Sequence, residues 1–286
     1  MSRAVSVFLL HALIDDFSSI PRSHASSGLG PPGRPVSPQV VGSPAVGCRA
    51  VHADHRPAAI VGTVPRGEDG LPVLIHGSAP RVLAAWRSLD AAGPGVGLDI
   101  AQERDRHCIE SVHRTLARLT ELPRRVPVIV GLALDPGWRD ALDLIRSRGR
   151  TVRFAGCGVS APDSPALVEA IRAAASLGCI FSWSCGPWGA VSDPWASPLP
   201  GILNVLLATG VALHGGSAAE VAAELGRGDP VDVVDAVCEL DEATARRIRA
   251  LLNGFAVHDV AGVVDALSAL DLLPKARPEA QQGAER

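Results

Sequence analysis

The segment VPVIVGLALDPGWRDALDLIRSRGRTVRFAG, residues 126–156, reads as a strand, a helix and a second strand in direct succession. Its first nine residues form an apolar, β-branched run with the length of a buried strand, and its last six have the same character. Between the two runs, Trp138, Leu142 and Ile145 recur with a helical period. Two strands joined by a helix in this way are expected to pair in parallel through a right-handed crossover.

The same alternation continues on both sides of this segment at intervals of about 25–30 residues, which is typical of repeated strand–helix units. Further short runs of β type lie at 71–77, 95–100 and 179–184, with weaker ones at 46–51, 58–64 and 255–258.

These candidate strands predict an α/β fold: a parallel (β/α)8-type barrel, complete or imperfect. An open, doubly wound parallel sheet is the alternative. No G-x-G-x-x-G sequence follows a strand, so the sequence contains no dinucleotide-binding fingerprint.

Several helix starts can be placed from capping residues. Asp135, Ser164 and Asp229 each stand directly before a proline, a pair that suits the first positions of a helix. Ser217 and Glu220 have the spacing of a capping box.

The chain divides into four parts by composition. Residues 1–16 have the apolar spacing of an amphipathic helix, and residues 17–45 form a segment rich in Ser, Pro and Gly that we expect to be irregular. Residues 46–273 are expected to form a single barrel-like domain, followed by a polar, disordered tail at 274–286.

Composition excludes several classes of function. The 27 basic and 30 acidic residues give a net charge of −3 with no basic block, which argues against a nucleic-acid partner. No apolar run approaches the ~18 residues of a spanning helix, which argues against a membrane partner. The six cysteines are dispersed, so we expect reduced thiols and a cytoplasmic protein. We expect a small, anionic ligand and leave homo-oligomerisation open.

The ligand of a parallel barrel or doubly wound sheet lies at the carboxyl ends of its strands, so polar residues there are candidates for the site. We expect the catalytic residues to come from one set and the substrate-binding residues from another. The first set is His76, Asp99, His258 and Cys185; the second is Arg153, Cys157, Ser182, Trp183, Trp188 and Asn204.

Each type of residue suggests a role. An imidazole changes charge nearest to neutral pH, so His76 or His258 would serve as general acid and base, with Asp99 orienting it. Arg153 alternates with apolar neighbours on a buried strand, where its charge must meet an anion or a carboxylate. Trp183 and Trp188 would form an apolar wall of the pocket.

We predict no cofactor. Cys48, His52 and His55 supply donor types that zinc could use, as do His107, Cys108 and His113. Neither cluster matches a recognised ligand spacing, so a zinc site is the less favoured reading.

From about residue 126 to 273, the order of motifs resembles an uncharacterised bacterial family of barrel-like proteins. The sequences VRFAGCGV, FSWSCGPWG, PGILNVLLA and FAVH occupy the places of the family's L-R-T-G-G, F-K-x-T-x-G-x-H-H, H-G-F-L-N-L-L-L-A and F-G-S-C signatures. The resemblance implies a barrel in which Arg153 and Asn204 carry over as site residues.

The chain departs from that family at its other polar positions. Ser182 stands in place of the family's lysine, Trp188 and Gly189 in place of its two histidines, and Pro200 in place of its helix histidine. A lysine at a barrel strand end is similar to that of Schiff-base aldolases. Lys275, in the polar tail, is the only lysine of this chain, so the sequence excludes a mechanism based on a barrel lysine.

The sequence therefore favours an enzyme of lyase or isomerase type that acts on a small anionic or carbonyl compound. The competing hypothesis is a degenerate, non-catalytic barrel that binds a ligand or a partner protein, because polar family positions are replaced by Trp, Gly and Pro.

Overall fold

Eight parallel strands form a closed barrel in the computed structural model of the chain. The strands follow the chain order around the barrel, and β1 closes the ring by pairing with β8. The structure describes residues 9–10, 14–16, 46–52, 73–88, 96–102, 108–155, 164–184, 189–192 and 200–273. The strands are β1 (Ile14–Asp16), β2 (Val46–His52), β3 (Val73–Gly77), β4 (Val96–Ile100), β5 (Val128–Ala133), β6 (Thr151–Ala155), β7 (Phe181–Ser184) and β8 (Leu252–Val257).

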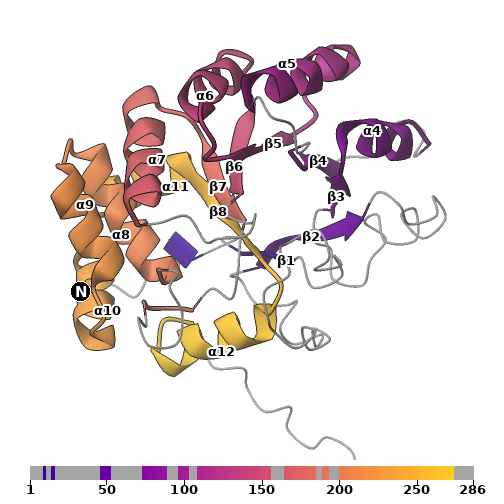
Figure 1. Cartoon of the computed structure of the whole chain (residues 1–286). Helices are drawn as coiled ribbons and strands as arrows, with labels where there is room; N and C mark the ends of the chain where they lie inside the picture. Colours follow the sequence, from indigo (N-terminus) through magenta and orange to yellow (C-terminus); the bar gives the residue numbers. More distant parts are fainter. Residues whose placement is uncertain are drawn as a thin grey trace, which may run out of the picture.

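Helices surround the strands on the outside of the ring (Figure 1). In the described residues, one helix follows each of β3, β4, β5, β6 and β8, with a short 3-10 helix after α5, whereas four helices lie between β7 and β8. Their bounds are α4 (Ala79–Ser88), α5 (Cys108–Arg118), η2 (Leu119–Glu121), α6 (Trp138–Ser147), α7 (Ser164–Leu177), α8 (Ile202–Leu213), α9 (Ala218–Gly226), α10 (Pro230–Glu239), α11 (Glu242–Leu251) and α12 (Val260–Ala269). The prediction of a parallel α/β barrel is confirmed.

Alternation along each strand separates two hydrophobic layers. Outward-facing residues such as Val152 and Phe154 belong to a large core shared with the helices. Inward-facing residues form a second, much smaller cluster of Ala50, Leu74, Ile129 and Ala256. This small cluster fills part of the barrel lumen, so polar side chains further along the same inward faces lie above an apolar floor.

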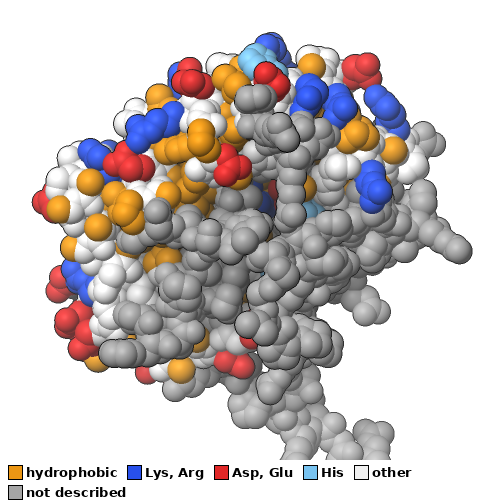
Figure 2. All heavy atoms as spheres, in the orientation of Figure 1, with side chains coloured by type: hydrophobic (Ala, Val, Ile, Leu, Met, Phe, Trp, Pro, Cys, Tyr) orange, Lys and Arg blue, Asp and Glu red, His pale blue; other side chains and the backbone are white. Residues whose placement is uncertain are grey.

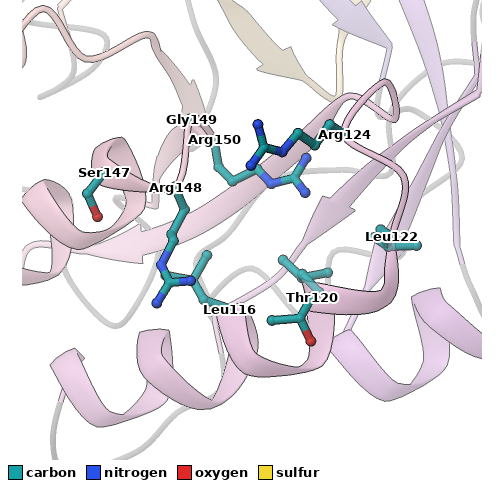
Figure 3. A pocket seen from close by; sticks show the side chains of 9 residues that line it. Leu116, Thr120, Leu122, Arg124, Ser147, Arg148, Gly149 and Arg150 are labelled. Carbon is teal, nitrogen blue, oxygen red and sulfur yellow. The ribbon is translucent and has the colours of Figure 1, made fainter.

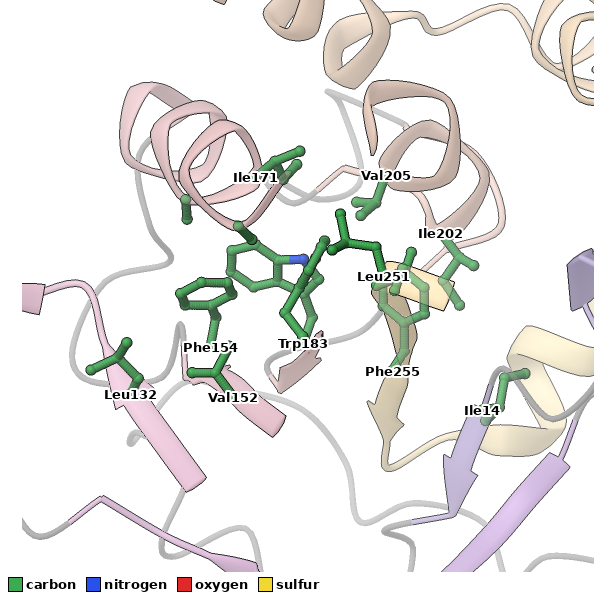
Figure 4. Packing of buried hydrophobic residues seen from close by; sticks show 14 of the residues in the cluster. Ile14, Leu132, Val152, Phe154, Ile171, Trp183, Ile202, Val205, Leu251 and Phe255 are labelled. Carbon is green, nitrogen blue, oxygen red and sulfur yellow. The ribbon is translucent and has the colours of Figure 1, made fainter. Parts of the chain in front are cut away.

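Aromatic rings dominate the outer layer beside β6 and β7. The ring of Phe154 lies 4.9 Å from that of Trp183 and 5.8 Å from that of Phe181, centroid to centroid. Figure 4 shows Trp183 between Ile171 of α7 and Val205 of α8. All three rings are fully buried, so this cluster anchors the helices to the strands.

The N-terminal boundary differs from the prediction. Ile14–Asp16 is the first barrel strand and pairs in parallel with both β2 and β8. The prediction of a helix over residues 1–16 is therefore wrong for residues 14–16. Leu9 and Leu10 are helical and buried. The barrel domain therefore begins before residue 46, since β1 is needed to close it. The segments 17–45 and 274–286 lie outside the described residues.

Two of the predicted helix starts are confirmed with their capping bonds. Asp229 accepts hydrogen bonds from the first turn of α10, and Ser217 forms a capping box with Glu220 at α9. The prediction for Asp135 is wrong: α6 begins at Trp138 after Gly137, whose backbone is left-handed with φ of 89°. Residues 135–137 form a turn before the helix, and Gly137 can end this turn because glycine adopts the left-handed conformation without steric cost.

Acidic and basic side chains are interspersed over the outer helices α7, α9 and α10 on the face shown in Figure 2. Within the described ranges, no helix has both the length and the apolar character needed to cross a membrane.

Candidate functional site

Adjacent strands bring His76 and Asp99 together inside the barrel. The two residues are register partners on β3 and β4, and both occupy the fourth position of a five-residue strand. His76 Nδ1 lies 2.9 Å from Asp99 Oδ2. The Asp99 side chain is 1% exposed, whereas that of His76 is 16% exposed. The imidazole therefore lies between the buried carboxylate and solvent.

Arg153 reaches the same carboxylate from β6, two strands away from Asp99. Its Nε donates a hydrogen bond to Asp99 Oδ1 over 3.3 Å, and its side chain is 3% exposed. Between them lies β5, where Gly131 is the register partner of Arg153. Because Gly131 has no side chain, β5 presents no inward group at this level, and the arginine can pass over it.

Gly131 is also required by the close approach of two backbones. A Cβ built at this position would lie 2.8 Å from the Gln102 nitrogen and 2.9 Å from the Ile100 oxygen. Both are backbone atoms at the end of β4, so no flexible side chain could move aside. A glycine inside an apolar strand often marks such an approach, so the position of Gly131 within residues 128–133 is itself a signal in the sequence.

The electrostatics of the cluster centre on Asp99. Burial alone would favour the neutral acid, but the charge of Arg153 and the hydrogen bond with His76 outweigh it and hold the pKa of Asp99 below its usual range. Asp99 is therefore a carboxylate at neutral pH. It offsets the buried charge of Arg153 and provides a fixed acceptor for His76.

Ser182 lies next to Arg153 on the inward face of β7. The two are register partners, and the Ser182 hydroxyl donates to the Val152 carbonyl over 3.4 Å. The side chain is fully buried. The structure thus places Ser182, predicted to bind substrate, beside the His76–Asp99–Arg153 cluster.

The arrangement suits proton transfer. If Nδ1 of His76 donates its hydrogen to Asp99, the proton-accepting position of the ring is Nε2, as in hydrolytic triads where a carboxylate orients a histidine. Nδ1 is assigned as the donor because an ionised carboxylate can only accept a hydrogen bond. Arg153 adds a positive charge that can stabilise negative charge developing nearby.

Trp183 is not a wall of this site, and that prediction is wrong. Its side chain is fully buried in the outer layer, in ring contact with Phe154 and Phe181. Strand alternation explains the error: Ser182 points into the lumen, so its neighbour Trp183 points toward the helices. Its role is packing.

Asn204 has a structural role in place of the predicted contact with substrate. Its Nδ2 donates to the carbonyls of Glu224 and Arg227, each over 2.8 Å, and its Oδ1 accepts from the Ser192 nitrogen over 2.8 Å. Both amide hydrogens are therefore used within the protein. The residue ties α8 to the end of α9 and to the segment 189–192.

Of the remaining predicted site residues, His258 lies in the part of the chain that the structure describes. His258 follows the last residue of β8 and is partly buried, and its catalytic role stays a prediction. Cys157, Cys185 and Trp188 lie outside the described residues.

The predicted zinc donors remain untested. Cys48 and His52 lie on β2, where only the backbone is described, and His55 and His107 lie outside the described ranges. Of the described residues, no three His, Cys, Asp or Glu side chains form a group that could hold a metal ion.

Fold and site together define a parallel eight-stranded α/β barrel with a buried His–Asp–Arg cluster at the carboxyl ends of its strands. No protein-family model matches the chain. No curated protein matches it either. Among solved structures, one similar chain is a candidate fructose-1,6-biphosphate aldolase from Coccidioides immitis, with 12% identity and a TM-score of 0.37 over 83% of this chain and 94% of that chain.

Proposed function

We propose that the protein is a small-molecule enzyme that moves a proton next to a carbonyl group, as a lyase or an isomerase does, at the carboxyl-end mouth of the barrel. The observation that carries the proposal is the pairing of His76 with a carboxylate that is itself held ionised by Arg153. The His76 ring alone of the three side chains has appreciable exposure.

In this mechanism, His76 acts as the general base and then as the general acid. Nε2 takes a proton from the carbon next to the carbonyl, and the electron pair left behind forms an enolate. Where that carbon carries a hydroxyl, transfer of the hydroxyl proton to the enolate oxygen and return of the first proton to the former carbonyl carbon complete an isomerisation. Where the next carbon carries a leaving group, the enolate electrons form the new C=C bond as the group departs with its bonding pair and takes the proton from His76, which completes an elimination. Asp99 stabilises the imidazolium formed in the first step, since the charge on the ring then faces a carboxylate.

Arg153 supplies the second electrostatic element. Its guanidinium lies in a dry part of the lumen, where a fixed charge acts more strongly than in water. Negative charge on the enolate oxygen, or on a carboxylate or phosphate of the substrate, is stabilised by it. Ser182, beside Arg153, is the adjacent polar group for the substrate.

An imine intermediate is not part of the proposal. The inward position on β7 where the resembling family has lysine is Ser182 here, and the only lysine of the chain is Lys275. The arginines cannot act as nucleophilic amines. Carbonyl activation therefore falls to charge and hydrogen bonding.

The alternative is a barrel that binds a ligand without turning it over. The buried Asp99–Arg153 pair favours it, because such a pair can also serve only to neutralise a charge inside a core. In that case His76 would contact Asp99 without transferring a proton to or from a ligand.

Proton exchange in D2O tests the proposal without knowledge of the pathway. A panel of small carbonyl acids and sugar phosphates is incubated with the protein, and loss of the proton next to the carbonyl is followed by NMR. We expect exchange with at least one compound, and a drop of at least about 100-fold in His76→Asn, in line with the usual contribution of a general base.

The matched control is His113→Asn, because His113 is exposed on α5, away from the cluster. It should leave exchange unchanged. Binding of a panel compound with no exchange would support the non-catalytic alternative, and equal exchange in wild type and His76→Asn would contradict the assignment of the base.

A further inference from the structure

A pocket lies at the end of the barrel opposite to the His76–Asp99–Arg153 cluster. It offers about 590 Å³ of space between the end of α5, the end of α6 and the starts of β5 and β6. Arg124, Arg148 and Arg150 line it (Figure 3). Arg150 directly precedes the first residue of β6, so the pocket is at the amino ends of the strands, away from His76 and Asp99.

The lining of the pocket is positively charged. None of its lining residues is acidic. Other exposed arginines of the outer surface, such as Arg87 and Arg139, pair with carboxylates of Glu121 and Glu169. Among the described residues, no ion pair joins Arg124, Arg148 or Arg150 to a carboxylate.

Two of the guanidinium groups face each other. Figure 3 shows the side chains of Arg124 and Arg150 close together, with Arg148 on the side of α6. Burial, and then the neighbouring charge of Arg124, lower the pKa of Arg150 from its ordinary value. Its Nη1 donates to the Val126 carbonyl over 3.2 Å, which fixes the group in the pocket.

Ordinary structural reasons account for only part of this charge. The carboxyl end of α6 favours one cation, and Arg148 directly follows that helix. The backbone N–H of Arg150 also bonds to the Ile145 carbonyl at the end of α6, but its guanidinium is directed to Val126, before β5. Arg124 lies between η2 and β5 and is not at the end of α6. The two hydroxyl groups of the pocket donate to backbone carbonyls, Thr120 to that of Ala117 and Ser147 to that of Leu144.

We propose that this arginine pocket, formed by Arg124, Arg148 and Arg150, binds a small molecule that carries phosphate groups. Planar guanidinium groups match phosphate oxygens in geometry and charge. The volume lies in the range of small-ligand sites, which is larger than a single inorganic ion requires. An anion between Arg124 and Arg150 would relieve the repulsion of the two charges.

Calorimetric titration of the full chain with pyrophosphate, and separately with glycerol phosphate, tests the proposal. The double variant Arg124→Gln/Arg148→Gln removes two charges from the pocket, and Arg87→Gln/Arg139→Gln removes two from elsewhere on the surface. We expect saturable binding of at least one probe that weakens at least about tenfold in the first variant and less than about twofold in the second. Tighter pyrophosphate binding would point to a diphosphate, and tighter glycerol phosphate binding to a phosphate ester.

Hydrogen exchange then locates the bound probe. Protection of residues 116–126 and 147–151 on binding is the expected result. Three results would overturn the proposal: no saturable binding of either probe, an equal loss of affinity in both double variants, or protection confined to the ends of β3 and β4. All four arginines are exposed, so unfolding free energies should stay within about 0.5 kcal/mol of wild type and loss of fold would not explain a loss of binding.

Discussion

Arg153 donates a hydrogen bond to Asp99 across the intervening strand β5, on which Gly131, without a side chain, is the register partner of Arg153. This relationship links three strands through one carboxylate. The ion pair of Arg153 and Asp99 lies buried inside the barrel, and Asp99 orients the partly exposed ring of His76. The stability of the lumen and the proposed chemistry both depend on it.

Substitution of Gly131 by alanine should disturb this link. The added Cβ would press on backbone atoms of β4 at 2.8 and 2.9 Å, so the end of β4 must shift. We expect a loss of about 1–3 kcal/mol in the free energy of unfolding, the usual cost of forcing an atom into a packed site. Denaturant titration measures it.

Gly226→Ala is the control for that change. No atom lies within 4 Å of the Cβ that it would add at the end of α9. A stability within about 1 kcal/mol of wild type is expected there. Equal stability of Gly131→Ala and wild type would contradict the close approach of β4 and β5.

Removal of the charge on Asp99 should cost more than removal of an exposed carboxylate. Asp99→Asn leaves the guanidinium of Arg153 buried without its counterion, and breaking a buried pair in this way costs about 3–5 kcal/mol. Asp143→Asn breaks an exposed pair with Arg146 and should cost at most about 1 kcal/mol. If chemical denaturation gave the same small loss for both variants, the buried pair would not stabilise the barrel.

The pH dependence of stability provides a separate prediction. The pKa of Asp99 is lowered on folding from its ordinary value of about 3.8. A depressed pKa contributes stability that is present above the unfolded value and is lost as the pH falls through the folded value. The difference in unfolding free energy between wild type and Asp99→Asn should therefore narrow as the pH falls below about 4. A difference that stayed constant down to about pH 2 would contradict the lowered pKa.

Asn204 should matter for stability and not for the site. Asn204→Ala leaves the Ser192 nitrogen and two carbonyls without the partners they now have, and each unsatisfied buried group costs about 1–3 kcal/mol. We expect a total loss of about 3 kcal/mol by thermal or chemical unfolding. Asn253→Ala, at an exposed position of β8, should lie within about 0.5 kcal/mol of wild type. If Asn204→Ala were as stable as wild type but had lost proton exchange, the result would support the substrate contact expected from the sequence instead.

Much of the fold could be predicted because the strands from β3 to β7 are apolar runs separated by helical periods. The first strand could not, since Ile14-Asp15-Asp16 has a single apolar residue and follows a helical pattern. Its strand character comes from pairing with β2 and β8, which are distant in sequence.

The candidate site was predictable in part for a similar reason. Strand ends identified His76, Asp99 and Arg153, because parallel strands gather their carboxyl ends. Strand alternation places Trp183 on the outer face of β7, opposite to Ser182. The partners of Asn204 depend on how α8 packs against α9, which no local pattern indicates. The arginine pocket joins residues from the ends of α5 and α6, and no sequence pattern connects them.

The hydrogen on the His76 ring tests the central claim most directly. Long-range ¹H–¹⁵N NMR at about pH 9, where histidine side chains are ordinarily neutral, reports which ring nitrogen carries it, and the spectrum of His76→Asn identifies the resonance. Because the ionised Asp99 can only accept, the hydrogen is expected on Nδ1, with Nε2 unprotonated. A hydrogen on Nε2 with Nδ1 unprotonated would contradict the account, since neither the contact with Asp99 nor the role of His76 as a base at Nε2 would then hold.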